Sequence, residues 1–193
     1  WQASETDQYD QKYDRDWMHE IPPMEHLRRG TVLDIHHAII PVVSRYAFDA
    51  TRLFDDAIEH SPGIFVLSPF DRIIHCAVHA FIEGVPSKAL RDLYDLNCLV
   101  RQHAATEELC KPLLARAKTL RLDKLLTDAL SATAALFSLP PAYEALNRTR
   151  SLRASMLRKA ALTANRPRAN AYHGLLLAHS HWMKMPMSLL IPH

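Results

Sequence analysis

Four stretches in the middle of the chain repeat their aliphatic residues every three or four positions, as amphipathic helices do. The repeat is clearest in Leu90, Leu93, Leu96 and Val100. It predicts four helices joined by short loops, at about 69–82, 86–103, 106–118 and 121–137. Helices connected in this way indicate a compact all-helical bundle.

The first of these helices has clear signals at both ends. Ser68 is a good N-cap, Pro69 suits the first helical position, and Asp71 places an acid in the first turn. Gly84 is the residue type that ends many helices. These local signals make 69–82 the best-defined helix of the sequence.

Before the bundle the pattern changes. Residues 1–20 lack periodicity, whereas 31–37 and 64–68 read as short strands, with a helix predicted between them at 47–59. The strand at 31–37 places Asp34 and His36 on one face. The whole chain is therefore predicted to be α+β and mostly α, with a few strands followed by a helical bundle.

The last part of the chain carries charge of one sign. A helix is predicted near 143–163, a break at 164–168 and another helix at 170–183. After Glu144 there is no Asp or Glu, while eight Lys and Arg follow. Such a section indicates a polyanion, an anionic membrane surface or an acidic surface of the same chain as its partner, and a solvated helix face is an equally good interpretation.

Composition narrows the class of protein. Of the 193 residues, 48% are hydrophobic and 23% are charged, and no apolar run reaches the length of a membrane-spanning helix. The three cysteines form no CxxC pair, which favours reduced, buried thiols and a cytoplasmic protein. The chain begins at Trp1 with a polar, acidic segment, which does not read as a secretory signal, so we expect a piece of a longer protein.

Asp34 and His36 are the first candidate functional residues. A carboxylate on a strand can bind a divalent cation or act as a base, and a histidine beside it can orient it. The alternative is an acid at a strand edge that is paired with the backbone or with a nearby arginine. The motif alone leaves both interpretations open.

A second candidate lies inside the bundle. His75 and His79 are four residues apart on one helix, and Asp92 and Asp95 follow on the next, an arrangement that could hold the metal of a phosphohydrolase. The favoured interpretation is structural, with the histidines hydrogen-bonded to these acids across the helical hairpin. No Gly-rich phosphate loop and no GxSxG motif occurs in the sequence.

The order of several short motifs resembles a known family. These are VLDIHHAI (32–39), LSPFDRIIHCAVHAF (67–81), LRDLYDLNCLV (90–100), LPP (139–141) and HWMKMPMSLLIPH (181–193). In this succession the chain resembles, over about residues 17–193, an uncharacterised bacterial nucleotidyltransferase family of the polymerase-β-like superfamily.

The resemblance implies Mg²⁺-dependent transfer of a nucleotidyl group from an NTP to an acceptor. In such enzymes a Gly-Ser turn holds the triphosphate, an Asp-x-Asp pair binds two Mg²⁺ ions, and a third carboxylate on a neighbouring strand completes the metal set. Asp34 matches that third carboxylate, which makes it the expected metal ligand. His36 would orient Asp34 or contact the substrate.

The sequence departs from this pattern in one respect. It contains no Gly-Ser pair, and its only Asp-x-Asp, at 14–16, follows no glycine turn. We therefore expect residues 1–68 to be the remnant of a catalytic domain, 69–141 a helical domain and 142–193 a basic helical section, the chain being inactive alone. Exposed strand edges would favour an oligomer.

The alternative function is a non-catalytic helical module whose basic face binds RNA, an acidic partner or a membrane.

Overall fold

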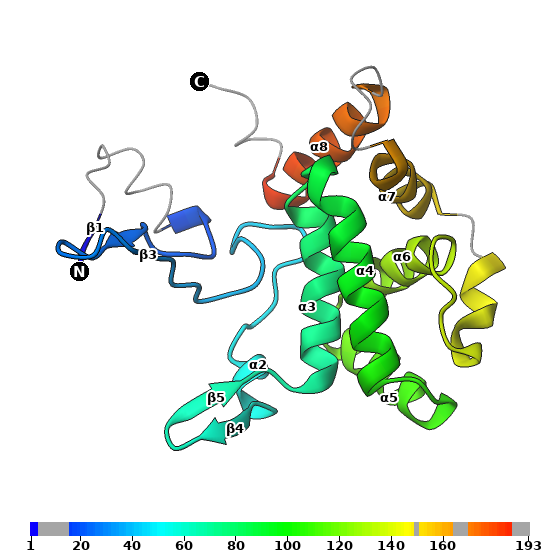
Figure 1. The fold of residues 1–193 in the computed structure, drawn as a ribbon, viewed down its shortest axis with the longest axis horizontal. Helices are drawn as coiled ribbons and strands as arrows, with labels where there is room; N and C mark the ends of the chain where they lie inside the picture. Colours follow the sequence, from blue (N-terminus) through cyan, green and yellow to red (C-terminus); the bar gives the residue numbers. More distant parts are fainter. Residues whose placement is uncertain (4–15, 149–150, 164–169, 187–193) are drawn as a thin grey trace.

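The structure is a computed structural model that describes residues 1–3, 16–148, 151–163 and 170–186. Within these ranges the chain is mostly helical, with one three-stranded and one two-stranded antiparallel sheet, both very small. The strands lie to one side of the helices, as Figure 1 shows. The predicted α+β, mostly α, class is therefore confirmed.

The bundle begins at the helix that the sequence defines best. Helix α3 spans Pro69–Ile82, and the side chain of Ser68 caps it by accepting a hydrogen bond from the backbone N–H of Asp71. Gly84 follows with a φ of +61°, a left-handed conformation that favours glycine. Helix α4, Pro86–His103, then returns alongside α3.

The remaining helices agree with the sequence less closely. The helix predicted at 121–137 ends earlier, at Ala134. The prediction of a single helix near 143–163 was wrong, because a 3₁₀ helix and an α-helix form there instead. Buried Tyr143 donates a hydrogen bond to the Ala104 carbonyl oxygen at 2.8 Å and so holds the 3₁₀ helix against the bundle. The predicted break at 164–168 lies outside the described residues. These elements are α5 (Glu107–Thr119), α6 (Asp123–Ala134), η1 (Pro141–Arg148), α7 (Leu152–Thr163) and α8 (Asn170–Lys184).

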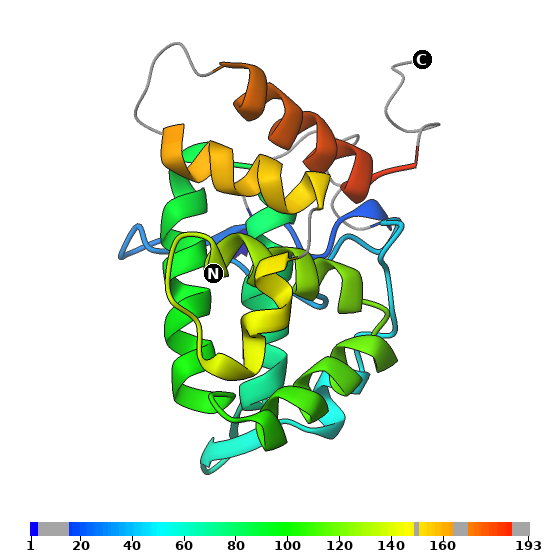
Figure 2. The same cartoon turned by 90° about the vertical axis from the view of Figure 1, so that its right-hand side faces the viewer.

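One hydrophobic core joins all of these helices. Leu93 of α4 and Leu126 of α6 are fully buried, and so are Leu157 of α7 and Leu176 of α8. Figure 2 shows α7 and α8 lying across one end of the bundle. The described helices after residue 141 thus share a core with those before it, and the division of the chain into three domains stays a prediction.

The N-terminal sheet is shorter than the sequence predicted. Strands β1 (Gln2–Ala3), β2 (Met24–Glu25) and β3 (Val32–Leu33) pair in that order. The strand expected at 31–37 ends at Leu33, because its apolar side chains are exposed and no buried face extends it. An isolated antiparallel bridge between Glu20 and His36 follows.

The helix predicted at 47–59 was also wrong. Only Arg52–Asp55 is helical (α2), and strands β4 (Ile58–Ser61) and β5 (Ile64–Val66) form a hairpin where the predicted helix and the following strand were expected to meet. Phe54 is 72% exposed and Ile58 is exposed as well, so of the apolar residues at helical spacing only Phe48 packs against the core. The strand predicted at 64–68 exists, with its end at Val66.

The segment between the sheets is attached to the last described helix. The Ser44 hydroxyl donates to the Met183 carbonyl oxygen at 2.8 Å, and Arg45 Nε donates to the Trp182 carbonyl oxygen at 2.9 Å. The Arg45 guanidinium also lies over the Trp182 ring, 4.5 Å from its centroid. Among the described helices, none has the length and apolar character that crossing a bilayer requires.

Candidate functional site

Asp34 lies on the surface immediately after β3. It occupies the two-residue stretch between the end of that strand and the bridge at His36, and its side chain is exposed. His36 is exposed as well. Both residues are therefore accessible from solvent, as a residue that binds a substrate or a metal must be, although Asp34 does not lie within a regular strand.

His36 meets two residues that sequence reasoning missed. The bridge places Glu20 opposite His36, and His36 Nε2 lies 3.3 Å from Glu20 Oε2. The ring of His19 lies 5.0 Å from that of His36, centroid to centroid. We refer to His19, Glu20 and His36 as the His–Glu–His cluster, since one ligand atom from each lies within 4.8 Å of the others.

The environment of His19 keeps its imidazole neutral. Burial first, and then charge repulsion from His36 and Lys184, lower the pKa of His19 to about 4. Its Nδ1 atom is buried and has no hydrogen-bond partner among the described residues. At pH 7 His19 therefore offers unprotonated nitrogen rather than positive charge.

A small apolar hollow of about 120 Å³ adjoins His36. Leu53, Phe54 and Leu67 supply apolar side chains, and His37 also lies in its wall. A ligand held there would contact both an imidazole and aliphatic or aromatic surface.

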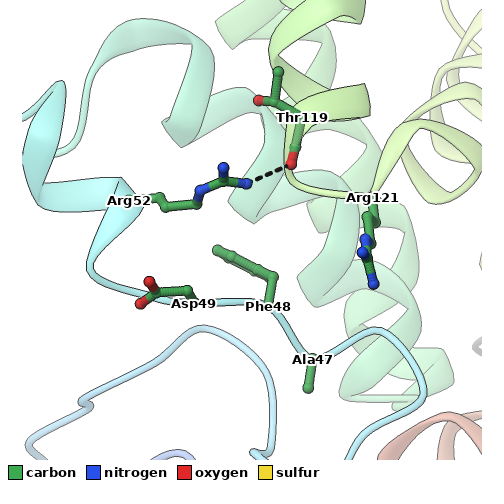
Figure 3. Close-up of a pocket in the computed structure, with 6 residues that line it drawn as sticks. All are labelled: Ala47, Phe48, Asp49, Arg52, Thr119 and Arg121. Carbon is green, nitrogen blue, oxygen red and sulfur yellow. Dashed lines mark hydrogen bonds between the residues drawn. The ribbon is translucent and has the colours of Figure 1, made fainter.

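A larger, polar hollow lies between the segment before α2 and the end of α5. It measures about 260 Å³, and Figure 3 shows Asp49, Arg52, Thr119 and Arg121 around it. Arg52 spans the hollow's edge by donating to the Thr119 carbonyl oxygen at 2.8 Å. No residue singled out from the sequence lines it.

The histidines and acids inside the bundle contact neighbouring side chains, as residues with a structural role do. The rings of His75 and His79 lie 6.1 Å apart, and His79 Nδ1 lies 3.6 Å from Asp92 Oδ2 on the neighbouring helix. Arg91 also contacts Asp92, at 3.2 Å, and Asp95 is exposed. Of the expected pairs across the helical hairpin, the structure therefore brings His79 to Asp92, at a separation longer than a hydrogen bond.

These four bundle residues do not gather as a metal site in the described structure. Among the described residues, three or more potential ligands converge only in the His–Glu–His cluster. Nearby, burial and the charges of Asp92 and Asp95 raise the pKa of the Cys76 thiol to about 12. A thiol with this pKa is not ionised at neutral pH, which agrees with the structural interpretation of Cys76. Cys110 is buried as expected, whereas Cys98 is exposed.

Two residues of the basic section have partners within the chain. Arg153 donates to Asp128 of α6 and to the Tyr46 hydroxyl, the second bond measuring 2.8 Å. Lys159 donates to the Tyr172 hydroxyl at 2.8 Å and lies over the same ring. An acidic side chain of the same protein is thus one partner of this section.

Comparison with known proteins identifies the family to which the chain belongs. Residues 1–138 match the family described as uncharacterised nucleotidyltransferase, and the chain belongs to that family. The resemblance expected from the motifs is confirmed, and nucleotidyl transfer is the general function of the class. The LPP motif at 139–141 and the closing motif at 181–193 lie beyond the matched region, and residues 187–193 lie outside the described ones. No curated protein and no solved structure shows a significant match.

The class implies NTP and a divalent metal, which allows a test of fit for Mg²⁺. Mg²⁺ takes oxygen ligands, usually one or two carboxylates with water and phosphate oxygens. Asp34 offers one carboxylate, but the only convergent ligand set among the described residues excludes it and contains two imidazoles. The described residues alone therefore do not fit a two-Mg²⁺ site.

Proposed function

We propose that this chain takes part in nucleotidyl transfer from an NTP to an acceptor, with Asp34 as one carboxylate of a composite Mg²⁺ site. The observation that carries the proposal is the position of Asp34, an exposed acid directly after β3 in the region that matches the family. A side chain placed in this way is free to point its oxygens at a metal–triphosphate complex.

The other ligands of such a site would come from outside the described residues. The sequence has no Gly-Ser pair to hold a triphosphate, and its only Asp-x-Asp motif falls at 14–16, where Asp14 and Arg15 are not described. The chain alone is therefore expected to bind an NTP weakly and to transfer no nucleotidyl group.

His36 has a contact role in this proposal. It lines the apolar hollow and faces Glu20, so it can touch a ligand at the hollow's mouth while Glu20 fixes its ring. The proposal does not assign His36 a proton-transfer step. A cytoplasmic location and association through exposed strand edges belong to the same proposal, and three free cysteines favour the first.

A basic binding module is the weaker alternative. It would need the positive side chains after residue 144 to face solvent, whereas Arg153 and Lys159 contact Asp128 and Tyr172 of the same chain. Binding driven by phosphate contacts would fall steeply as salt rises. The salt dependence of any RNA binding would therefore distinguish the two functions.

Titration calorimetry with each of the four NTPs tests the role of Asp34. We expect weak binding that requires Mg²⁺ and falls at least tenfold in Asp34→Asn, because a charged metal ligand is lost while the side-chain size is kept. Glu25→Gln is the matched control, since Glu25 is an exposed acid on the adjacent strand β2. Equal binding by Asp34→Asn and the unchanged protein, or no Mg²⁺ dependence, would contradict the proposal.

A further inference from the structure

We propose that the His–Glu–His cluster is a binding site for a transition-metal ion of the Zn²⁺ type, separate from the Mg²⁺ site of the class. The ligands would be an imidazole nitrogen of His19, a carboxylate oxygen of Glu20 and Nε2 of His36. This inference does not depend on Asp34 or on Mg²⁺ binding, and it uses His36 and Glu20, to which the proposed function gives a ligand-contact role.

The separations within the cluster suit one ion. Two ligand atoms on a tetrahedral Zn²⁺ ion with bonds near 2.1 Å lie about 3.4 Å apart. His36 Nε2 and Glu20 Oε2 are already 3.3 Å apart, and the cluster's three ligand atoms all lie within 4.8 Å of one another. Small rotamer changes at His19 would therefore complete the set.

Backbone hydrogen bonds hold the three residues in position. The N–H of His37 donates to the His19 carbonyl oxygen at 2.9 Å, and the N–H of Ile21 donates to the Ile35 carbonyl oxygen at 3.0 Å. These bonds flank the bridge between Glu20 and His36, and residues opposite each other in an antiparallel pair share a face. The cluster therefore rests on paired backbone rather than on a chance meeting of long side chains.

The chemistry of the donors selects the ion. Two imidazoles and one carboxylate suit Zn²⁺ and neighbouring transition metals, whereas Mg²⁺ and Ca²⁺ take oxygen ligands. Three protein ligands leave a position open for water or another molecule. Because Mg²⁺ prefers oxygen ligands and this cluster offers two imidazole nitrogens, the cluster suits a different kind of metal ion.

The state of His19 supports the assignment. Its buried Nδ1 has no hydrogen-bond partner among the described residues, and a buried polar atom is expected to have one. Direct coordination of a metal ion by Nδ1 would account for this unpaired atom.

Zn²⁺ titration of the tag-free protein against a chromophoric chelator tests the proposal. We expect one equivalent of Zn²⁺ to bind, and the affinity to fall at least tenfold in both Glu20→Gln and His36→Gln. His60→Gln is the matched control, because His60 is an exposed histidine on the β4–β5 hairpin. Far-UV circular dichroism of each variant checks that the helices are intact.

Co²⁺ provides an independent readout. Its visible absorption reports coordination by nitrogen and oxygen ligands, so a spectrum present in the unchanged protein should disappear in His36→Gln. Zn²⁺ binding that is unchanged in both cluster variants would overturn the proposal. So would binding that is lost in His79→Gln instead, because the ion would then lie inside the bundle. Excess Mg²⁺ should not displace the bound Zn²⁺, and displacement at similar concentrations would also overturn it.

Discussion

At the scale of single residues, Arg116 of α5 holds together parts of the chain that are distant in sequence. Its Nε and Nη2 atoms donate to the two carboxylate oxygens of Asp71 at 2.9 and 3.0 Å. It also contacts Asp56, at 2.9 Å, and the Arg52 carbonyl oxygen, at 2.7 Å. Asp71 is fully buried, so its charge depends on this arginine for compensation.

Replacing Arg116 with Leu should destabilise the protein by about 3 kcal/mol, because a buried carboxylate would lose its partner. Urea unfolding followed by circular dichroism measures the change. Lys111→Ala is the control: it removes an exposed pair with Glu107 and should cost less than about 0.5 kcal/mol.

The double variant Arg116→Leu, Asp71→Leu sharpens this test. Removing both charges leaves no unpaired carboxylate, so the double variant should regain a large part of the lost stability. A loss of stability in the double variant equal to the sum of the losses in Arg116→Leu alone and Asp71→Leu alone would show that Arg116 acts through packing instead.

At the scale of elements, the sequence predicts structure well where the signals are local. Ser68, Pro69 and Gly84 mark the ends of α3, and each acts within a few residues of its own position. The region at 47–59 misleads because Phe54 and Ile58 have helical spacing but face solvent. Pro62 and Gly63, a pair that is typical of a helix end, form the turn of the β4–β5 hairpin instead.

In the candidate site, too, the sequence predicts what local signals encode and misses what depends on distant pairing. Asp34 and His36 could be found from sequence because an acid and a histidine alternate within one predicted strand. His19 and Glu20 could not, because their pairing with His36 depends on a bridge across 16 positions that no local pattern encodes. The His-Glu doublet itself was the only available signal, and it lay in a stretch without periodicity.

The contact between α3 and α8 leads to a prediction for Gly84. A Cβ atom at this position would lie 2.5 Å from the Ser180 Cβ atom, while the Ser180 hydroxyl donates to the Ile82 carbonyl oxygen. Gly84→Ala should therefore destabilise the protein by at least about 2 kcal/mol, from left-handed backbone strain and from displacement of α8. Thermal and urea unfolding measure the loss.

Gly63→Ala separates the two causes. Gly63 also has a positive φ, +74°, but no described atom outside its immediate neighbours lies within 4 Å of the point that an alanine Cβ would occupy. Its substitution should cost only the backbone strain, about 1 kcal/mol. If both substitutions lower the free energy of unfolding by the same amount, α8 can shift to accommodate the added Cβ atom, and its packing on α3 is loose.

At the scale of the whole molecule, two hydrogen bonds connect the segment that follows the His–Glu–His cluster to the end of α8. Ser44 and Arg45 contact the backbone of Met183 and Trp182, across 139 and 137 positions of sequence respectively. The helical core does not need these contacts, since its buried side chains come almost entirely from α3 onward. The N-terminal segment should therefore be able to open without unfolding the bundle.

Arg45→Ala tests this independence. Loss of one hydrogen bond and of the stacking on Trp182 removes about 1.4 kcal/mol, which corresponds to roughly tenfold less protection from amide exchange in residues 36–50. Protection in α3 and α4 should not change, and neither region should respond to the control Arg28→Ala, which alters an exposed arginine in the turn between β2 and β3. Hydrogen exchange read by mass spectrometry resolves the regions. A parallel loss of protection in α3 and α4 would show that the segment and the bundle open as one unit, and the segment that carries Asp34 and His36 would then be part of the cooperative core.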